Sequence, residues 1–161
     1  MKKFVLTTLI FGASLISMAQ VNIIPKPVSV KTDLQNTGFT INSQTRIVIG
    51  NDSLKTAATF FNNYLEKYLH LKLSVTKIKP AENYISLNVS TNVSTYKDAY
   101  LLASSAKNIA ITGTSKPGVF YGVQTLLQLL PTSKAQNLNI PAVSITDYPR
   151  FGYRGLMLDV A

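Results

Sequence analysis

The residues whose types and spacing could do chemistry lie near the end of the chain. Arg154 and Asp159 stand at the two ends of a short apolar run, and Gly155 beside the arginine lets the backbone pack closely. A fully apolar run is typical of a strand buried on both faces, and in a parallel β/α barrel the residues at strand ends line the active-site face. A guanidinium there can donate two parallel hydrogen bonds to adjacent hydroxyls of a sugar. The spacing leaves a second interpretation open, in which Arg154 and Asp159 form a structural ion pair at a domain junction.

Other residues that could do chemistry are few. The 161-residue chain has no cysteine and a single histidine, His70, which excludes disulfides and thiolate chemistry and argues against a histidine triad. Glu66 falls on the solvent side of a predicted helix, Glu82 falls in a turn, and no aspartate is followed directly by a glutamate. We therefore expect no metal site, no cofactor and no complete hydrolytic site within these residues.

The positive charge of the chain is dispersed. A formal net charge of +9 comes mainly from lysines spread singly along the sequence. Nucleic-acid readout favours arginine and needs basic residues clustered on one face. The pattern therefore predicts a lysine-rich solvated surface and disfavours a nucleic-acid-binding protein.

The first nineteen residues have the organisation of a secretory signal peptide. Lys2 and Lys3 precede an apolar run at 4–16, and the small residues around Ser17 and Ala19 suit cleavage before Gln20. The run is shorter than a membrane-spanning helix needs, and nothing later in the chain is long enough to span. We expect an exported bacterial protein, periplasmic or extracellular, with no transmembrane segment in the mature chain.

After this signal, the sequence predicts an α+β domain at 20–147. In the segment 84–89, Ile85, Leu87 and Val89 alternate with Ser86 and Asn88, which indicates a sheet with one solvated face and hence antiparallel strands. Helices are predicted over 54–69 and 117–130. The extended segments are predicted at 21–32, 38–41, 46–49, 73–78, 84–89, 99–103, 108–112 and 138–147.

The two helices differ in their patterns. The first has apolar residues on one face, with Asn62 and Glu66 among the residues assigned to the solvent side. The second, Pro117–Leu130, is apolar nearly all the way round, which is typical of a helix covered on both sides. Because the sheet can cover only one side, we expect a neighbouring domain to pack on this helix. The apolar run that reaches Ala161 predicts that 148–161 begin that domain and are cut short.

Three stretches together resemble the family 20 glycoside hydrolases, the exo-acting β-N-acetylhexosaminidases. IIPKPVSV is similar to the start of the N-terminal domain of those enzymes, GVFYGVQTLLQLL to its second helix, and YPRFGYRGLMLDVA to the opening of their catalytic domain. The resemblance implies an α+β domain made of an antiparallel sheet with two helices on one face. The truncated start of a (β/α)8 barrel would follow at residues 148–161.

The same resemblance implies a function. The full-length protein would remove terminal non-reducing GlcNAc or GalNAc by substrate-assisted retaining hydrolysis. Arg154 would bind hydroxyls of the terminal sugar, and Asp159 would orient neighbouring residues at the barrel mouth. The catalytic Asp-Glu pair would lie beyond Ala161, so these 161 residues would be inactive alone. A non-catalytic accessory or carbohydrate-binding α+β module is the alternative, although it explains neither the second helix nor the Arg154–Asp159 run.

Overall fold

The computed structural model describes residues 22–131, 138–153 and 155. The two α-helices of this part are α1 (Lys55–Leu69) and α2 (Lys116–Leu129), and short 3-10 turns η1 (Asp52–Leu54) and η2 (Thr91–Val93) accompany them. The strands are β1 (Ser29–Thr32), β2 (Phe39–Ile41), β3 (Arg46–Ile49), β4 (Ser74–Thr76), β5 (Tyr84–Val89), β6 (Tyr100–Ser104), β7 (Asn108–Gly113), β8 (Leu138–Ile140) and β9 (Val143–Asp147).

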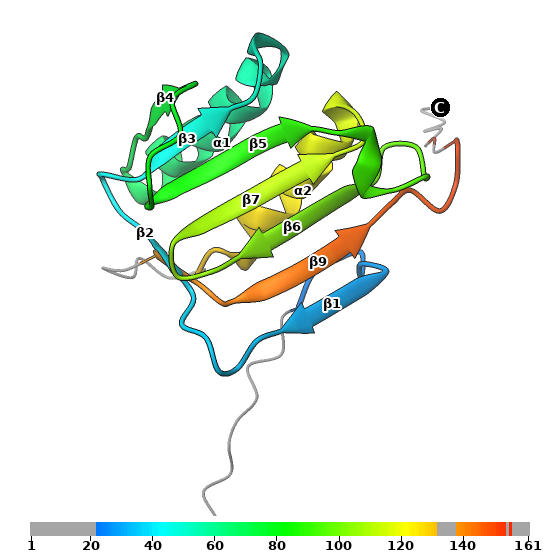
Figure 1. The fold of residues 1–161 in the computed structure, drawn as a ribbon, viewed down its shortest axis with the longest axis horizontal. Coiled ribbons are helices and arrows are strands. Elements are labelled where there is room, and N and C mark those ends of the chain that lie inside the picture. Colours follow the sequence, from blue (N-terminus) through cyan, green and yellow to red (C-terminus); the bar gives the residue numbers. More distant parts are fainter. Residues whose placement is uncertain (1–21, 132–137, 154, 156–161) are drawn as a thin grey trace, which may run out of the picture.

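Seven strands form one sheet in the order β1-β9-β6-β7-β5-β3-β4, and β2 pairs with β8 beside it. Figure 1 shows both helices behind this sheet, while the face toward the viewer carries no helix. The α+β class with two helices on one face, predicted from the sequence, is therefore confirmed.

The expected antiparallel sheet is a mixed sheet. β1, β9, β6 and β7 pair antiparallel, whereas β5 pairs parallel with β7 and with β3, and β3 pairs parallel with β4. The parallel half arises because α1 returns the chain from the end of β3 to the start of β4, which is the connection that parallel neighbours need. The alternation of apolar and polar residues in β5 carries no information about strand direction, and it marks burial only in part, because Ser86 is 7% exposed and Val89 is 38% exposed.

The core lies between the sheet and the helices. Side chains such as Ile85 and Ile111 from the sheet meet Phe61 and Leu126 from the helices, and each is at most 2% exposed. α1 follows directly on η1 and has no side-chain cap of its own, whereas α2 begins at a polar cap. Asn51 caps η1 ahead of α1, and Ser115 Oγ accepts a hydrogen bond from Gly118 N at the start of α2.

Asn62 does not lie on the solvent side of α1, where its polarity placed it. It is 7% exposed, and its side chain bonds both polar backbone groups of Leu73: Nδ2 donates to the carbonyl over 2.8 Å, and Oδ1 accepts from the amide over 2.9 Å. The chain leading into β4 thus closes over this side chain and satisfies it. The sequence pattern does not distinguish a buried asparagine of this kind from an exposed one, which is why the prediction was wrong.

The expectation that nothing in this domain covers the second side of α2 is wrong in part. α1 lies beside α2, and Phe60 of α1 packs against Phe120 of α2 with 5.0 Å between ring centroids. The exposed residues of α2 are Lys116 and Pro117 in its first turn, Tyr121, which is 39% exposed, and Gln128. The wide apolar surface of α2 therefore packs against both the sheet and α1 of this domain.

The close approach of α2 to the sheet depends on a glycine. A Cβ placed on Gly122 would lie 2.5 Å from Ile111 Cγ2 and 3.2 Å from Tyr100 Cδ2. The first distance is shorter than carbon atoms tolerate and the second is tighter than most such contacts, so the observed approach of α2 to the sheet leaves no room for a side chain at this position.

The N-terminal segment before β1 is fastened to the outer side of α2. Ile24 N donates to Gln128 Oε1 over 2.8 Å, and Gln128 Nε2 donates back to Ile24 O over 3.0 Å. Beside it, Ile23 is buried. The first part of the extended segment predicted at 21–32 thus crosses α2, and we call residues 22–28 the N-terminal strap.

Candidate functional site

The two residues predicted to do chemistry, Arg154 and Asp159, lie outside the described residues. The described chain leads toward them through 149–153 and includes Gly155. Within it, Phe151 is 71% exposed and Tyr153 is 88% exposed, so this domain covers neither ring.

The chain just before this stretch is held firmly to the domain. Tyr148 stacks on Tyr96, with ring centroids 3.8 Å apart and planes within 5° of parallel. One residue earlier, Asp147 Oδ1 accepts a hydrogen bond from Val28 N over 3.2 Å. The end of β9 is therefore tied both to the loop before β6 and to the start of β1, which fixes where the chain leaves the domain.

A small cavity lies between the N-terminal strap, α2 and the end of β9. Its volume is about 130 Å³, and Ile23, Tyr121, Gln124 and Pro149 are among its lining residues. At this cavity the first and last segments of the domain both contact α2, and we call this place the junction.

Tyr100 also lines this cavity, and its hydroxyl lies 2.5 Å from Thr125 Oγ1. Burial raises the pKa of Tyr100 to about 12, the Thr125 hydrogen bond opposes that shift, and the negative charge of Asp147 adds to it. Tyr100 is therefore neutral at physiological pH. The neutral Tyr100 hydroxyl can form hydrogen bonds but cannot act as a base. We therefore interpret the junction as a structural contact.

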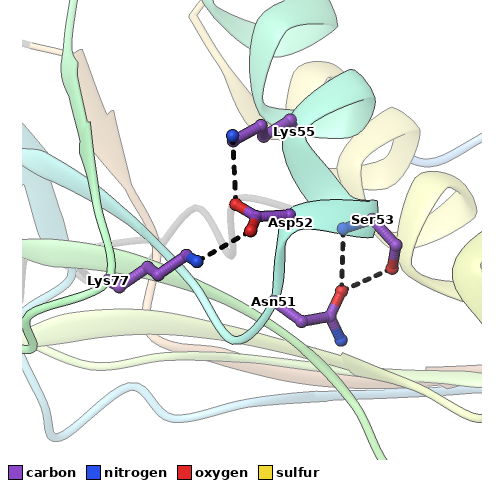
Figure 2. Close-up of polar contacts among 5 residues, drawn as sticks. All are labelled: Asn51, Asp52, Ser53, Lys55 and Lys77. Carbon is purple, nitrogen blue, oxygen red and sulfur yellow. Dashed lines mark hydrogen bonds and ion pairs between the residues drawn. The ribbon is translucent and has the colours of Figure 1, made fainter.

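A second polar cluster surrounds the start of α1 (Figure 2). Asp52 Oδ1 lies 3.0 Å from Lys55 Nζ, and Asp52 Oδ2 lies 2.8 Å from Lys77 Nζ, while Asn51 Oδ1 accepts from Ser53 N over 3.0 Å. The hydrogen bonds from Lys77 and Lys55 lower the pKa of the Asp52 carboxyl. An ionised, exposed carboxylate held by two ammonium groups cannot deliver a proton. The cluster ties the start of α1 to the segment after β4.

An aromatic row crosses the outer surface of the helix layer. It consists of Phe120, Phe60, Tyr64 and Tyr68, with 4.7 Å between the ring centroids of the last two. Tyr68 is 50% exposed and Phe60 38% exposed. Sequence reasoning missed the contribution of α1, although Phe60, Tyr64 and Tyr68 recur at every fourth position and so share one helix face.

His70 takes a structural place. It ends α1 in the left-handed conformation with φ of 53°, and its N–H bonds Leu65 O. Within the described ranges, no three acidic, histidine or cysteine side chains gather as metal ligands would. None of the described helices has the length and apolarity needed to cross a membrane.

Known relatives share both sequence and fold with this chain. The β-hexosaminidase of Porphyromonas gingivalis is 35% identical over 147 residues, which cover 87% of this chain and 19% of that protein. The crystal structure of an exo β-N-acetylglucosaminidase from Vibrio harveyi in complex with N-acetylglucosamine matches with a TM-score of 0.70 and 27% identity, over 82% of this chain and 20% of that one. A Streptomyces plicatus β-hexosaminidase mutant in complex with its product GlcNAc matches with a TM-score of 0.71 and 26% identity, over 82% of this chain and 27% of that one.

The chain thus spans about a fifth of the length of the first of these relatives. The family model described as glycosyl hydrolase family 20, domain 2 matches residues 20–148. This match ends at the tyrosine whose ring stacks on Tyr96. Because the model covers most of the chain, and sequence relatives and solved structures agree with it, the chain belongs to glycosyl hydrolase family 20.

Proposed function

We propose that this chain is the N-terminal part of an exported β-N-acetylhexosaminidase, which removes terminal GlcNAc or GalNAc from the non-reducing ends of oligosaccharides or glycans. The observation that carries the proposal is the family match over residues 20–148, which ends where the stacked Tyr148 leads into the Arg154 stretch. Relatives named β-hexosaminidase and a neighbour bound to N-acetylglucosamine support the sugar class.

In the proposed reaction, the 2-acetamido oxygen of the substrate attacks its own anomeric carbon. An aspartate orients that amide, and the adjacent glutamate protonates the leaving oxygen and later activates water. This sequence contains no adjacent Asp-Glu pair, so we place the pair downstream of Ala161 and assign no catalytic residue here. Arg154 binds hydroxyls of the terminal sugar through its planar fork, and Asp159 orients neighbouring groups.

The downstream barrel packs, in this proposal, on the outer surface of the helix layer. The aromatic row on α1 and α2 and the half-exposed Tyr121 supply apolar surface for it. The barrel contact thus reaches α1 as well as the Pro117–Leu130 segment. Export follows from the signal-like residues 1–19, with cleavage before Gln20.

The test of the sugar-binding role is Arg154→Lys in the full-length enzyme, assayed on an aryl N-acetyl-β-glucosaminide. Lysine keeps the charge but loses the fork, so kcat/KM should fall about 10²–10³-fold with an unchanged melting temperature. Arg150→Lys is the matched control, because Arg150 is exposed just before the same stretch and should lose little activity. An unchanged kcat/KM with a lowered melting temperature would establish the structural ion pair with Asp159 instead.

The barrel contact has its own test. Tyr68→Lys should lower the melting temperature of the full-length protein, since it places a charge in the proposed interface. Asn63→Lys adds the same charge at an exposed position on the same helix and should have little effect. Equal effects of the two variants would reject the interface. Purified residues 20–161 should show no turnover, and measurable turnover would reject the downstream Asp-Glu pair.

A further inference from the structure

The segment that leads toward Arg154 begins at an anchored tyrosine. The ring of Tyr148 stacks on the ring of Tyr96, with 3.8 Å between the centroids and 5° between the planes. Tyr96 belongs to the loop between η2 and β6, and in Figure 1 the chain runs from the tip of β9 toward this loop. The place of Tyr148 is therefore set by a residue far from it in sequence.

Tyr96 is itself held at both of its backbone polar groups. Its N–H donates to Ser94 Oγ over 3.1 Å, and its carbonyl oxygen accepts from Thr114 Oγ1 over 3.2 Å. Thr114 follows β7 directly, and its Oγ1 also accepts a hydrogen bond from Ala99 N over 3.0 Å. The loop that carries the Tyr96 ring is thus fastened to the end of the central strand β7, and it can serve as a fixed platform for Tyr148.

A second contact holds the residue just before Tyr148. Asp147, the last residue of β9, accepts a hydrogen bond from Val28 N at its Oδ1 over 3.2 Å. The β9 strand that ends there is paired on both sides, with β1 and with β6. Contacts from two different parts of the domain therefore act on adjacent residues, and together they restrict both the position and the direction of the chain where it leaves the domain.

The step that follows Tyr148 is stiff. Pro149 has a φ angle fixed by its ring, and a proline also restricts the residue before it to extended conformations. Beyond Pro149, Phe151 and Tyr153 are 71% and 88% exposed, so contacts of their rings with this domain do not redirect the chain. What this domain contributes to the approach to Arg154 is therefore the direction that the chain receives at Tyr148.

We propose that Tyr96 is a positioning residue for the hydrolysis, which acts through Tyr148 to place Arg154 against the terminal sugar. The inference rests on the proposed sugar-binding role of Arg154. A guanidinium fork holds two adjacent hydroxyls in one orientation, and a displacement of about 1 Å at such a contact is costly in rate. Loss of the Tyr96 ring frees Tyr148, and the contact between Arg154 and the sugar weakens although both of those residues are intact.

The experiment is a double-mutant cycle on the full-length enzyme, assayed on the aryl N-acetyl-β-glucosaminide well below every melting temperature. Tyr96→Ala alone should raise KM and lower kcat/KM about tenfold. In the Arg154→Lys background the same substitution should lower kcat/KM less than about twofold, because the fork that it displaces is already absent. Tyr96→Phe keeps the ring and should restore the wild-type values. Lys97→Ala, at the exposed neighbouring position, is the matched control and should leave both constants unchanged.

The KM value separates positioning from a loss of folded enzyme. An unfolded fraction lowers the apparent kcat and leaves KM unchanged, whereas a displaced Arg154 raises KM. The proposal is overturned if Tyr96→Ala lowers kcat alone, or if it costs as much in the Arg154→Lys background as in the wild type. A large loss in Arg154→Lys with none in Tyr96→Ala would reject the positioning and leave the role of Arg154 standing. An unchanged kcat/KM in Arg154→Lys would reject that role and the positioning with it.

Discussion

Tyr148 lies flat on Tyr96, with ring centroids 3.8 Å apart and planes 5° from parallel. This contact joins the last residue of the family match to the loop between η2 and β6. The direction in which the chain leaves the domain is thus set by a side-chain contact formed far from it in sequence.

Removing one ring of this pair should loosen the exit of the domain. Tyr96→Ala is expected to lower the free energy of unfolding by about 1 kcal/mol and to speed proteolysis between residues 148 and 153. Tyr96→Phe keeps the ring and should behave like the wild type in both measurements. Fast cleavage in both variants would show that stacking does not hold the exit segment.

Asn62 should be among the most sensitive polar residues of the domain. Asn62→Ala leaves the buried amide and carbonyl of Leu73 without partners, so we expect a loss of about 3 kcal/mol in urea denaturation. Asn63→Ala changes the neighbouring exposed asparagine and should cost less than about 0.5 kcal/mol. Similar losses for the two would contradict the role assigned to the Leu73 contacts.

Gly122→Ala should destabilise the domain although alanine favours a helix by about 1 kcal/mol. The new methyl group would lie 2.5 Å from Ile111 Cγ2, so α2 or the Ile111 side chain must shift, at a net cost of about 1–3 kcal/mol. At Gly152 an added Cβ meets nothing within 4 Å, and Gly152→Ala is the control. A melting temperature raised by Gly122→Ala would show that helix propensity outweighs the clash.

The ion pairs of Asp52 predict that the free energy of unfolding depends on pH. Its pKa in the folded state is lowered from 3.8 by Lys77 and Lys55, so folding favours the ionised form. The resulting stability is present above pH 3.8 and is lost as the pH falls through the lowered folded-state pKa. Wild type should therefore exceed Asp52→Asn in stability at neutral pH, and the two unfolding curves should converge in acid. A difference that persists unchanged in acid would rule out the ion pairs as its source.

Much of the fold could be predicted from local patterns. The predicted helix at 54–69 is observed as Lys55–Leu69, and the predicted strand at 84–89 is observed as Tyr84–Val89. These elements are encoded by side-chain periodicity and caps, which depend only on neighbours in sequence. Strand direction in the β3–β5–β7 half was wrong because periodicity carries no information about which strands pair.

The contacts between residues far apart in the sequence could not be predicted in the same way. The bonds between Ile24 and Gln128 join residues 104 positions apart, and the partners of Asn62 come from a loop. The sequence does not show whether a polar side chain contacts water or hydrogen-bonds a backbone group. Arg154 and Asp159 were singled out by their places at the two ends of an apolar run, and the roles that the family resemblance gives them stay predictions.

The pairing of the first strand with the last has a mechanical consequence. Ser29 at the start of β1 lies opposite Thr146 near the end of β9, so the two ends of the domain leave from the same end of one strand pair. Tension between these ends loads the hydrogen bonds one after another, as in a zipper, instead of shearing all of them together. The first bonds to bear the load are those of Val28 with Asp147 and of Ile24 with Gln128. A pull between its two ends should therefore peel this domain open from the β1 edge at low force, while the strands around β5 and β7 stay folded.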